Sequence, residues 1–160
     1  MEANNCYIVE SPLGNIEITH SDTHVTALSF VDDMANRTPS EHPLVKQTQA
    51  QLLEYFEGKR EKFQLPINPE GTEFQKKVWL LLLKIPFGRT LSYLKLSQMS
   101  GNIKAIRAIA AAVGKNPILI LIPCHRIIGS NGQMIGYSGG IPRKKSLLEL
   151  EQKNPQKSLF

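Results

Sequence analysis

The sequence predicts an α+β protein with two domains: a small antiparallel sheet with a helix, followed by a mainly helical domain of the helix-turn-helix type. Short runs typical of β-strands fill residues 6–31, and apolar residues at helical spacing dominate the later segments. Prolines and glycines gather at 65–71, where the charge balance also changes. We therefore expect an N-terminal α/β domain at 1–68 and a C-terminal domain at 72–155.

Charge is distributed unevenly along the 160 residues. Residues 1–71 hold 5 Lys and Arg against 11 Asp and Glu, a net charge of −6, whereas residues 72–150 hold 12 against 2, a net charge of +10. A basic half of this kind suits neutralisation of nucleic-acid phosphates, although a merely solubilising basic surface is the alternative. No apolar stretch is long enough to span a membrane, so we expect no membrane partner.

The first domain is expected to be a meander with one helix. Residues 6–20 contain two β-like runs around a turn at 12–14, and residues 25–31 form a third. After a loop with two prolines, apolar residues from 44 to 56 follow helical spacing and end near Gly58. That helix is predicted to pack on the sheet.

The second domain is expected to begin with a capped helix. Thr72 and Gln75 have the spacing of a capping box, in front of the apolar run 78–85. Pro86 then ends the helix, because proline cannot continue the backbone hydrogen-bond ladder.

Two shorter helices are predicted at 92–99 and 104–113, joined by a turn at Gly101. This is the spacing of a helix-turn-helix. The second helix is rich in alanine, and Ala105 and Ala108 leave a surface with little side-chain bulk. Such a surface suits close approach to DNA, and it suits packing against a core helix equally well.

The remaining chain carries the most reactive residues. Residues 118–122 predict a buried strand, directly followed by Cys124. Five glycines between 129 and 140 indicate a tightly turning loop. Residues 145–151 are expected to form the beginning of a last helix.

Cys124 is a candidate nucleophile, because a thiol next to a histidine and a carboxylate can be activated by proton transfer. His125 follows Cys124 directly, so activation needs a turn or a bridging water, and Glu151 is a candidate to orient the imidazole. Cys6 and Cys124 lie far apart and lack the paired spacing of zinc ligands. We predict separate thiols, and no metal or other cofactor.

Residues 120–126, Ile-Leu-Ile-Pro-Cys-His-Arg, match an active-site signature. On that match the chain resembles the O6-alkylguanine-DNA alkyltransferases, also called methylated-DNA–protein-cysteine methyltransferases. The similarity extends to Asn-Pro at 116–117, to Gly-Tyr-Ser-Gly-Gly at 136–140 and to Arg-Thr-Leu-Ser-Tyr at 89–93. It covers about residues 72–151 with consistent spacing.

The resemblance implies a ribonuclease H-like first domain and a winged helix-turn-helix second domain. It implies DNA repair by a methyltransferase that reacts once, moving the alkyl group from O6-alkylguanine irreversibly to Cys124, with O4-alkylthymine as a further candidate substrate. The expected partner is double-stranded DNA, bound through its minor groove with the damaged base flipped out. The protein is expected to be a cytoplasmic monomer; whether it binds DNA cooperatively stays open.

The resemblance also implies a role for each candidate catalytic residue. Cys124 accepts the alkyl group, and His125 acts through a water as its base. Glu151 holds His125, and Asn116 holds the conformation of the site. Tyr93 pushes against the target phosphate and assists proton transfer to the base.

The same matching places Arg107 in the duplex, where the extruded guanine stood. The other predicted DNA contacts, besides Tyr93, are Lys104, Ala105, Ala108, Lys115 and Arg126. The residues predicted to line the substrate pocket are Val113, Pro123, Ile127, Tyr137 and Ser138.

Three other functions compete with this interpretation. A lesion-binding protein of the same architecture would flip the base without transferring the group, and the presence of Cys124 argues against it. A winged-helix transcription regulator would carry Cys124 as an incidental core thiol. A cysteine hydrolase would need an oxyanion hole, which nothing in the motif specifically requires.

Overall fold

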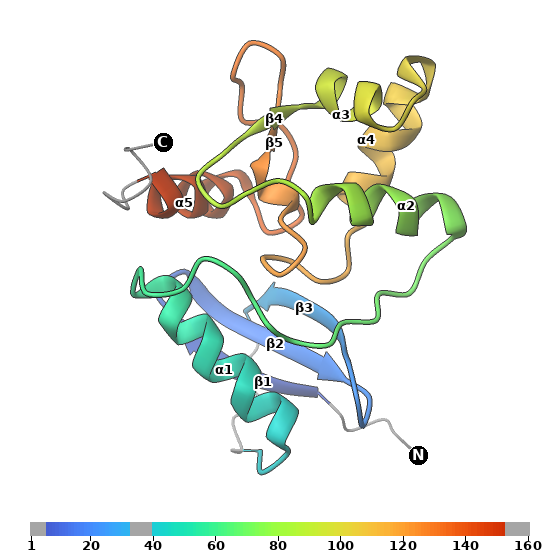
Figure 1. Cartoon of the computed structure of the whole chain (residues 1–160). Coiled ribbons are helices and arrows are strands. Elements are labelled where there is room, and N and C mark those ends of the chain that lie inside the picture. Colours follow the sequence, from blue (N-terminus) through green and yellow to red (C-terminus); the bar gives the residue numbers. More distant parts are fainter. Residues whose placement is uncertain (1–5, 33–39, 153–160) are drawn as a thin grey trace. The chain divides into compact units, whose positions relative to one another are not determined.

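The computed structural model describes residues 6–32 and 40–152, and the chain divides into two compact units, residues 1–70 and residues 71–160 (Figure 1). The first unit holds a sheet with one helix, and the second holds four α-helices and a short parallel strand pair among the described residues. The predicted α+β class is confirmed. No helix within the described ranges is long and apolar enough to cross a membrane.

The sheet of the first unit is the predicted meander. Strands β1 (Cys6–Ser11), β2 (Gly14–His20) and β3 (Val25–Val31) lie in the order β1-β2-β3, and both pairs are antiparallel. Gly14 adopts a positive φ of 121° at the first turn, a conformation that favours glycine. Alternate residues face inward, and those of β2 include the fully buried Ile16 and Ile18.

Helix α1 (Pro43–Phe56) packs against β1 and β2 and closes the core of this unit. His42 caps it, with the ring Nδ1 accepting a hydrogen bond from the Leu44 amide at 3.1 Å. The helix ends where Gly58 takes a positive φ of 78°. The buried face is made of residues at helical spacing: Leu44, Val45, Thr48, Leu52 and Tyr55.

Part of the expected linker, residues 65–71, is hydrogen-bonded to the sheet. Val25 donates its amide to the Pro66 carbonyl and accepts from the Asn68 amide, both at 2.8 Å, which makes a parallel bridge between Val25 and Ile67. The chain therefore leaves the first unit only after residue 68.

The second unit begins with α2 (Glu73–Leu82), and the predicted capping box is present. The Thr72 hydroxyl accepts from the Gln75 amide, while the Gln75 side chain accepts from the Thr72 amide. Trp79 lies on the buried face of α2 and donates its indole N–H to the Ala112 carbonyl at 2.9 Å. This bond attaches α2 to the later helix that contains Ala112.

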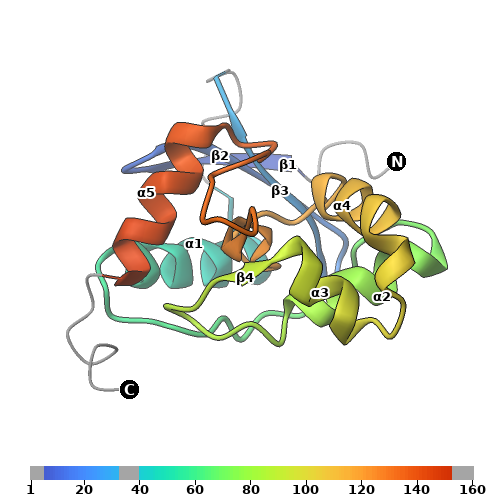
Figure 2. The ribbon, with the colours of Figure 1, turned by 90° about the horizontal axis from the view of Figure 1, so that it is seen from above.

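The helix-turn-helix is formed by α3 (Tyr93–Met99) and α4 (Ile106–Gly114), with a 3-10 turn, η1 (Ile103–Ala105), leading into α4. Both predicted helices are confirmed. In Figure 2 α4 lies beside α3 and α2, in agreement with their contacts. Just before α3, β4 (Leu91–Ser92) pairs in parallel with β5 (Ile127–Ile128).

The prediction of a buried strand at 118–122 is wrong. The segment forms compact turns, in which the Ile122 amide bonds to the Ile118 carbonyl at 3.0 Å and the Leu121 amide to the Leu119 carbonyl at 2.7 Å. Ile120 has a positive φ of 71°, outside the extended region that a strand requires. Local hydrogen bonds satisfy this backbone in place of a neighbouring strand.

Candidate active site

Cys124 opens a short 3-10 turn, η2 (Cys124–Arg126), that packs against the last helix, α5 (Ile141–Gln152). The residue is 5% exposed. Burial raises the pKa of its thiol to about 11, while a hydrogen bond from the Asn116 side chain and the charge of Lys144 act to lower it. Ionisation of Cys124 therefore depends on its neighbours rather than on water.

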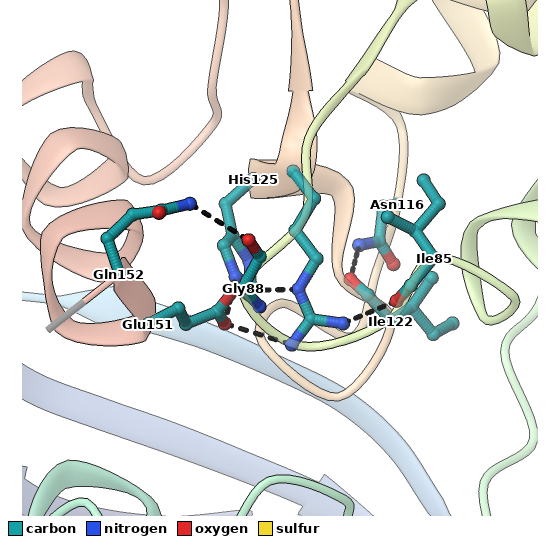
Figure 3. Close-up of polar contacts among 8 residues, drawn as sticks. Ile85, Gly88, Asn116, Ile122, His125, Glu151 and Gln152 are labelled. Carbon is teal, nitrogen blue, oxygen red and sulfur yellow. Dashed lines mark hydrogen bonds and ion pairs between the residues drawn. The ribbon is translucent and has the colours of Figure 1, made fainter. Parts of the chain in front are cut away.

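His125 is fully buried, and its Nε2 lies 2.7 Å from Glu151 Oε2 (Figure 3). Burial lowers the pKa of His125, and the Glu151 carboxylate opposes that shift. Since a carboxylate only accepts, Nε2 carries the hydrogen and Nδ1 is the basic nitrogen of the neutral ring. Nδ1 is buried and has no hydrogen-bond partner within the described residues, so it can take a proton.

Glu151 joins His125 to Arg126. Its Oε1 accepts from Arg126 Nε at 2.8 Å and from the Gly88 amide at 3.4 Å, and its Oε2 accepts from Arg126 Nη2 at 2.9 Å. Burial raises the pKa of Glu151, but the contacts to His125 and Arg126 outweigh it and hold the value at about 2. The carboxylate is thus a fixed negative charge behind the imidazole.

The prediction that Arg126 contacts DNA is contradicted. Arg126 is 6% exposed, and besides Glu151 its guanidinium bonds to the Ile85 carbonyl at 2.6 Å and lies 5.8 Å from the centre of the Phe87 ring. A guanidinium held inside the unit by a carboxylate cannot reach a phosphate on the surface. Its role is to fix Glu151.

Asn116 holds the turn segment that leads to Cys124. Its Oδ1 accepts from the Ile118 amide at 2.9 Å, and its Nδ2 donates to the Ile122 carbonyl at 2.8 Å (Figure 3). One amide side chain thereby ties the two ends of the 118–122 segment together. The same side chain lowers the pKa of the Cys124 thiol by hydrogen bonding.

Two phenols lie near the thiol. Tyr93 begins α3 and donates its hydroxyl to the Ile135 carbonyl at 3.5 Å; burial raises the pKa of Tyr93, and the charge of ionised Cys124 adds to the shift. Burial likewise raises the pKa of Tyr137 well above its usual range, with Cys124 as a second cause. The Tyr137 hydroxyl is buried without a partner in the described part of the chain.

The other predicted pocket residues differ in exposure. Val113, Pro123 and Ile127 are buried, whereas Ser138 is exposed. An open cleft of about 440 Å³ lies in the same unit and includes Tyr93, but neither Cys124 nor these four residues line it. The lining residues of the cleft are Tyr93, Leu94, Ile106, Gly129, Ser130, Asn131, Gln133 and Ile135.

The remaining predicted DNA contacts lie on or beside the second helix of the helix-turn-helix. Lys104 and Ala105 belong to η1, Arg107 and Ala108 to α4, and Lys115 follows the last residue of α4. Ala105 is half-buried and the other four are exposed. The β4–β5 pair connects this element to the Cys124 turn, since β4 precedes α3 and β5 follows η2.

Sequence reasoning missed Lys144. This lysine of α5 is fully buried and donates from Nζ to the carbonyls of Ile135 at 2.8 Å and Gly136 at 3.1 Å. A signal was available, because Lys144, Leu147, Leu148 and Glu151 follow the i, i+3, i+4, i+7 spacing of one helix face. A lysine in line with two leucines and the candidate carboxylate should be buried too.

Such a site defines a class of protein: one in which a buried cysteine is followed by a histidine that is paired with a glutamate, in the same unit as a helix-turn-helix. The family model described as 6-O-methylguanine DNA methyltransferase, DNA binding domain, matches residues 73–153. The model for the ribonuclease-like domain of the same protein matches residues 6–69. The chain belongs to the methylated-DNA–protein-cysteine methyltransferase family.

Comparisons with individual relatives agree with this family assignment. The chain is 40% identical over 152 residues to the methylated-DNA–protein-cysteine methyltransferase of Methanosarcina barkeri, covering 92% of this chain and 96% of the relative. It is 40% identical over 154 residues to that of Mycobacterium leprae, covering 92% of each. Among solved structures, Mycobacterium tuberculosis OGT in complex with DNA is similar with a TM-score of 0.85 at 36% identity over 93% of each chain.

Proposed function

We propose that this protein repairs alkylated DNA directly, by moving the alkyl group from O6 of guanine to Cys124 Sγ. The observation that carries the proposal is the buried ring of His125, the residue after Cys124, with Nε2 fixed by Glu151 and Nδ1 buried and able to accept a proton. A methylated-DNA–protein-cysteine methyltransferase needs this combination, because a neutral thiol is a poor nucleophile. We assign DNA binding and alkyl acceptance to residues 72–155 and no chemistry to residues 1–68.

The reaction begins with proton transfer. His125 Nδ1 takes the Cys124 proton through a bridging water, and Glu151 stabilises the imidazolium that forms. The thiolate attacks the alkyl carbon, the S–C bond forms as the C–O6 bond breaks, and the electron pair stays on guanine. The Tyr93 hydroxyl neutralises the departing base by donating a proton.

The product explains single turnover. A thioether offers water no electrophilic carbonyl, in contrast to the thioester of an acyl-enzyme, so Cys124 is not regenerated. Each chain therefore reacts once, and repair is stoichiometric.

DNA binding is assigned to the helix-turn-helix, through the minor groove. The alkyl carbon can be attacked in line only after the nucleotide leaves the stack, which costs on the order of a few kcal/mol. Arg107 is exposed on α4 and long enough to fill the gap that the everted base leaves. The open cleft that contains Tyr93 supports approach of a nucleotide from this side of the unit.

We further propose that the protein acts as a monomer in the cytoplasm. All the residues assigned to the chemistry belong to the second unit of one chain, so no second copy is required to complete the site. Both cysteines are free thiols, which fits a reducing compartment.

The test is a mass measurement on equimolar protein and a duplex that contains O6-methylguanine. We expect a gain of about 14 Da, the mass of CH2, which saturates at one per chain and maps to the peptide of Cys124. Cys6→Ser should react like the parent protein, whereas Cys124→Ser should gain nothing. Repeated turnover, or label on Cys6, contradicts the proposed mechanism.

A further inference from the structure

The turn segment that leads to Cys124 contains a residue with an unfavourable backbone conformation. Ile120 has a φ of 71°, and among the residues that the structure describes it is the one residue other than glycine with a positive φ. The branch at Cβ makes this conformation costly for isoleucine. Such strain persists only where the surrounding structure enforces it, and it is concentrated at functional sites.

A strained turn surrounds Ile120. The Leu121 amide donates to the Leu119 carbonyl at 2.7 Å and closes a γ-turn of three residues with Ile120 at its centre. With a positive φ at the centre, this is the rarer and more strained of the two forms of the γ-turn. The Ile122 amide, bonded to the Ile118 carbonyl at 3.0 Å, closes the segment from outside. The Ile120 side chain is buried, so packing and hydrogen bonds together hold the strained conformation.

The Ile122 carbonyl connects this turn to the nucleophile. It accepts from Asn116 Nδ2 at 2.8 Å (Figure 3) and from the Cys124 amide, also at 2.8 Å. The second bond closes another γ-turn around Pro123, whose φ of −81° and ψ of 61° belong to the common inverse form. The backbone of Cys124 is therefore placed by a carbonyl whose own position depends on the turn at Ile120.

We propose that Ile120 is a positioning residue for Cys124: its buried side chain and its positive φ hold the Ile122 carbonyl where the amide of the nucleophile can bond to it. Attack on an alkyl carbon requires alignment, and a displacement of about 1 Å can slow such a reaction by on the order of 100-fold. For the alkyl-transfer step, this inference rests on the proposed function. The hydrogen bond of the Cys124 amide does not, because it is present without DNA.

The test compares two substitutions at one position. Ile120→Ala and Ile120→Gly both remove the packing side chain, but only glycine adopts a positive φ without strain. Ile120→Val, which keeps the branch at Cβ, is the conservative variant. Leu82→Ala is the matched control, because Leu82 is fully buried in α2 of the same unit and belongs to no part of the site.

Three quantities are measured on each full-length protein. Urea titration gives the folding equilibrium. Hydrogen exchange followed by NMR gives the protection of the Cys124 amide relative to the amides of α4 in the same protein, which corrects for overall stability. Single-turnover methyl uptake from a saturating duplex with O6-methylguanine gives the rate of transfer, and anisotropy gives the Kd for the duplex.

We expect Ile120→Gly to be more stable than Ile120→Ala, by on the order of fivefold in the folding equilibrium, which reverses the usual order of these residues. In both variants the relative protection of the Cys124 amide and the rate of transfer should fall by about tenfold or more, with the Kd for DNA unchanged. Ile120→Val and Leu82→Ala should keep the relative protection and the rate within about threefold of the parent protein.

Greater stability of Ile120→Ala than of Ile120→Gly overturns the proposal, because the positive φ would then carry no cost. Failure of Ile120→Ala alone to fold supports it, as the extreme case of the expected order. Parent-like protection and rate in Ile120→Ala, or an equal loss in Leu82→Ala, reduces Ile120 to a packing residue and also overturns the proposal. The stability order and the exchange measurement need no DNA. Absence of methyl uptake by the parent protein therefore refutes the proposed function, while these two measurements still decide whether Ile120 positions Cys124.

Discussion

Cys6 and Cys124 are the same residue type in two different surroundings. Burial is the main reason that the pKa of each thiol rises to about 11. Around Cys6, a hydrogen bond and the charge of Glu17 raise the pKa further, and only Thr19 opposes them. Around Cys124, Asn116 and Lys144 both lower it. Burial therefore does not distinguish a reactive thiol from an inert one; the neighbours that respond to the anion do.

The two units also differ in the surroundings of their charged residues. Residues 1–71 carry a net charge of −6 and residues 72–150 a net charge of +10. In the first unit the ion pair of Lys46 with Glu41 is exposed and contributes little. In the second unit Glu151 is buried between His125 and Arg126, and such a network is costly to interrupt.

The largest expected effect comes from Glu151→Gln. The substitution leaves the Arg126 charge buried without a counter-charge, and we expect unfolding of the second unit to become easier by about 3–5 kcal/mol. Trp79, the single tryptophan, lies in this unit and reports the transition by fluorescence in urea. Glu149→Gln, at an exposed position of the same helix, should change little. A decrease of less than about 1 kcal/mol in the unfolding free energy of Glu151→Gln would contradict this expectation, because it would show that water solvates the Arg126 guanidinium when the carboxylate is removed.

The stability of the folded state should depend on pH because of the same carboxylate. The pKa of Glu151 is lowered from 4.5 to about 2, so its ionised form stabilises the folded state. That stabilisation is complete above the unfolded value and is lost as pH falls from about 4.5 towards 2, on the order of 3 kcal/mol in total. Urea titrations at a series of acidic pH values should show this loss in the parent protein and a smaller one in Glu151→Gln. Equal acid sensitivity of the two proteins would contradict the assignment.

Asn116→Ala should have an intermediate effect. It removes both hydrogen bonds across the 118–122 segment and leaves the Ile118 amide and the Ile122 carbonyl buried, a loss of about 1–3 kcal/mol. Methyl uptake should slow as well, because the thiol loses a hydrogen bond that lowers its pKa. Asn68→Ala, at an exposed position of the first unit, is the control for both measurements. An unchanged rate of uptake in Asn116→Ala would limit Asn116 to a structural role.

Local patterns were sufficient for much of the fold. The capping box at Thr72 and the alternation in β2 depend on residues a few positions apart, and both were predicted correctly. The segment 118–122 was mispredicted because a run of branched apolar residues fits a buried strand or a buried turn equally well. Only the Asn116 side chain, which replaces a strand partner, decides between them.

Charged residues show a second limit of prediction from the sequence. Arg126 was counted among the DNA contacts, although it is buried. Its carboxylate partner is Glu151, 25 residues further along the chain. Lys144 was not considered, although its spacing with Leu147, Leu148 and Glu151 places it on the buried face of α5. The residues alone made Cys124, His125 and Glu151 candidates, and the resemblance implied a role for each of them.

A smaller effect is expected from the charge contrast between the units. Lys104→Ala and Lys115→Ala should each reduce the slope of log binding constant against log salt by about 1, if each residue neutralises one phosphate. Lys62→Ala, an exposed substitution in the acidic unit, should leave the slope unchanged. Fluorescence anisotropy of a labelled duplex at several salt concentrations measures all three. Equal slopes for all variants would remove the helix-turn-helix from the binding surface.

The smallest effect should come from Cys6→Ser. Cys6 is half-buried on β1, and its sulfur accepts from the Thr19 hydroxyl at 3.9 Å, a contact that serine can keep. We expect stability within about 0.5 kcal/mol of the parent protein and an unchanged rate of methyl uptake. Chemical denaturation and the mass assay measure the two quantities. A slower uptake in Cys6→Ser would mean that the thiol of the acidic unit takes part in the reaction, and the contrast between the two cysteines would then fail.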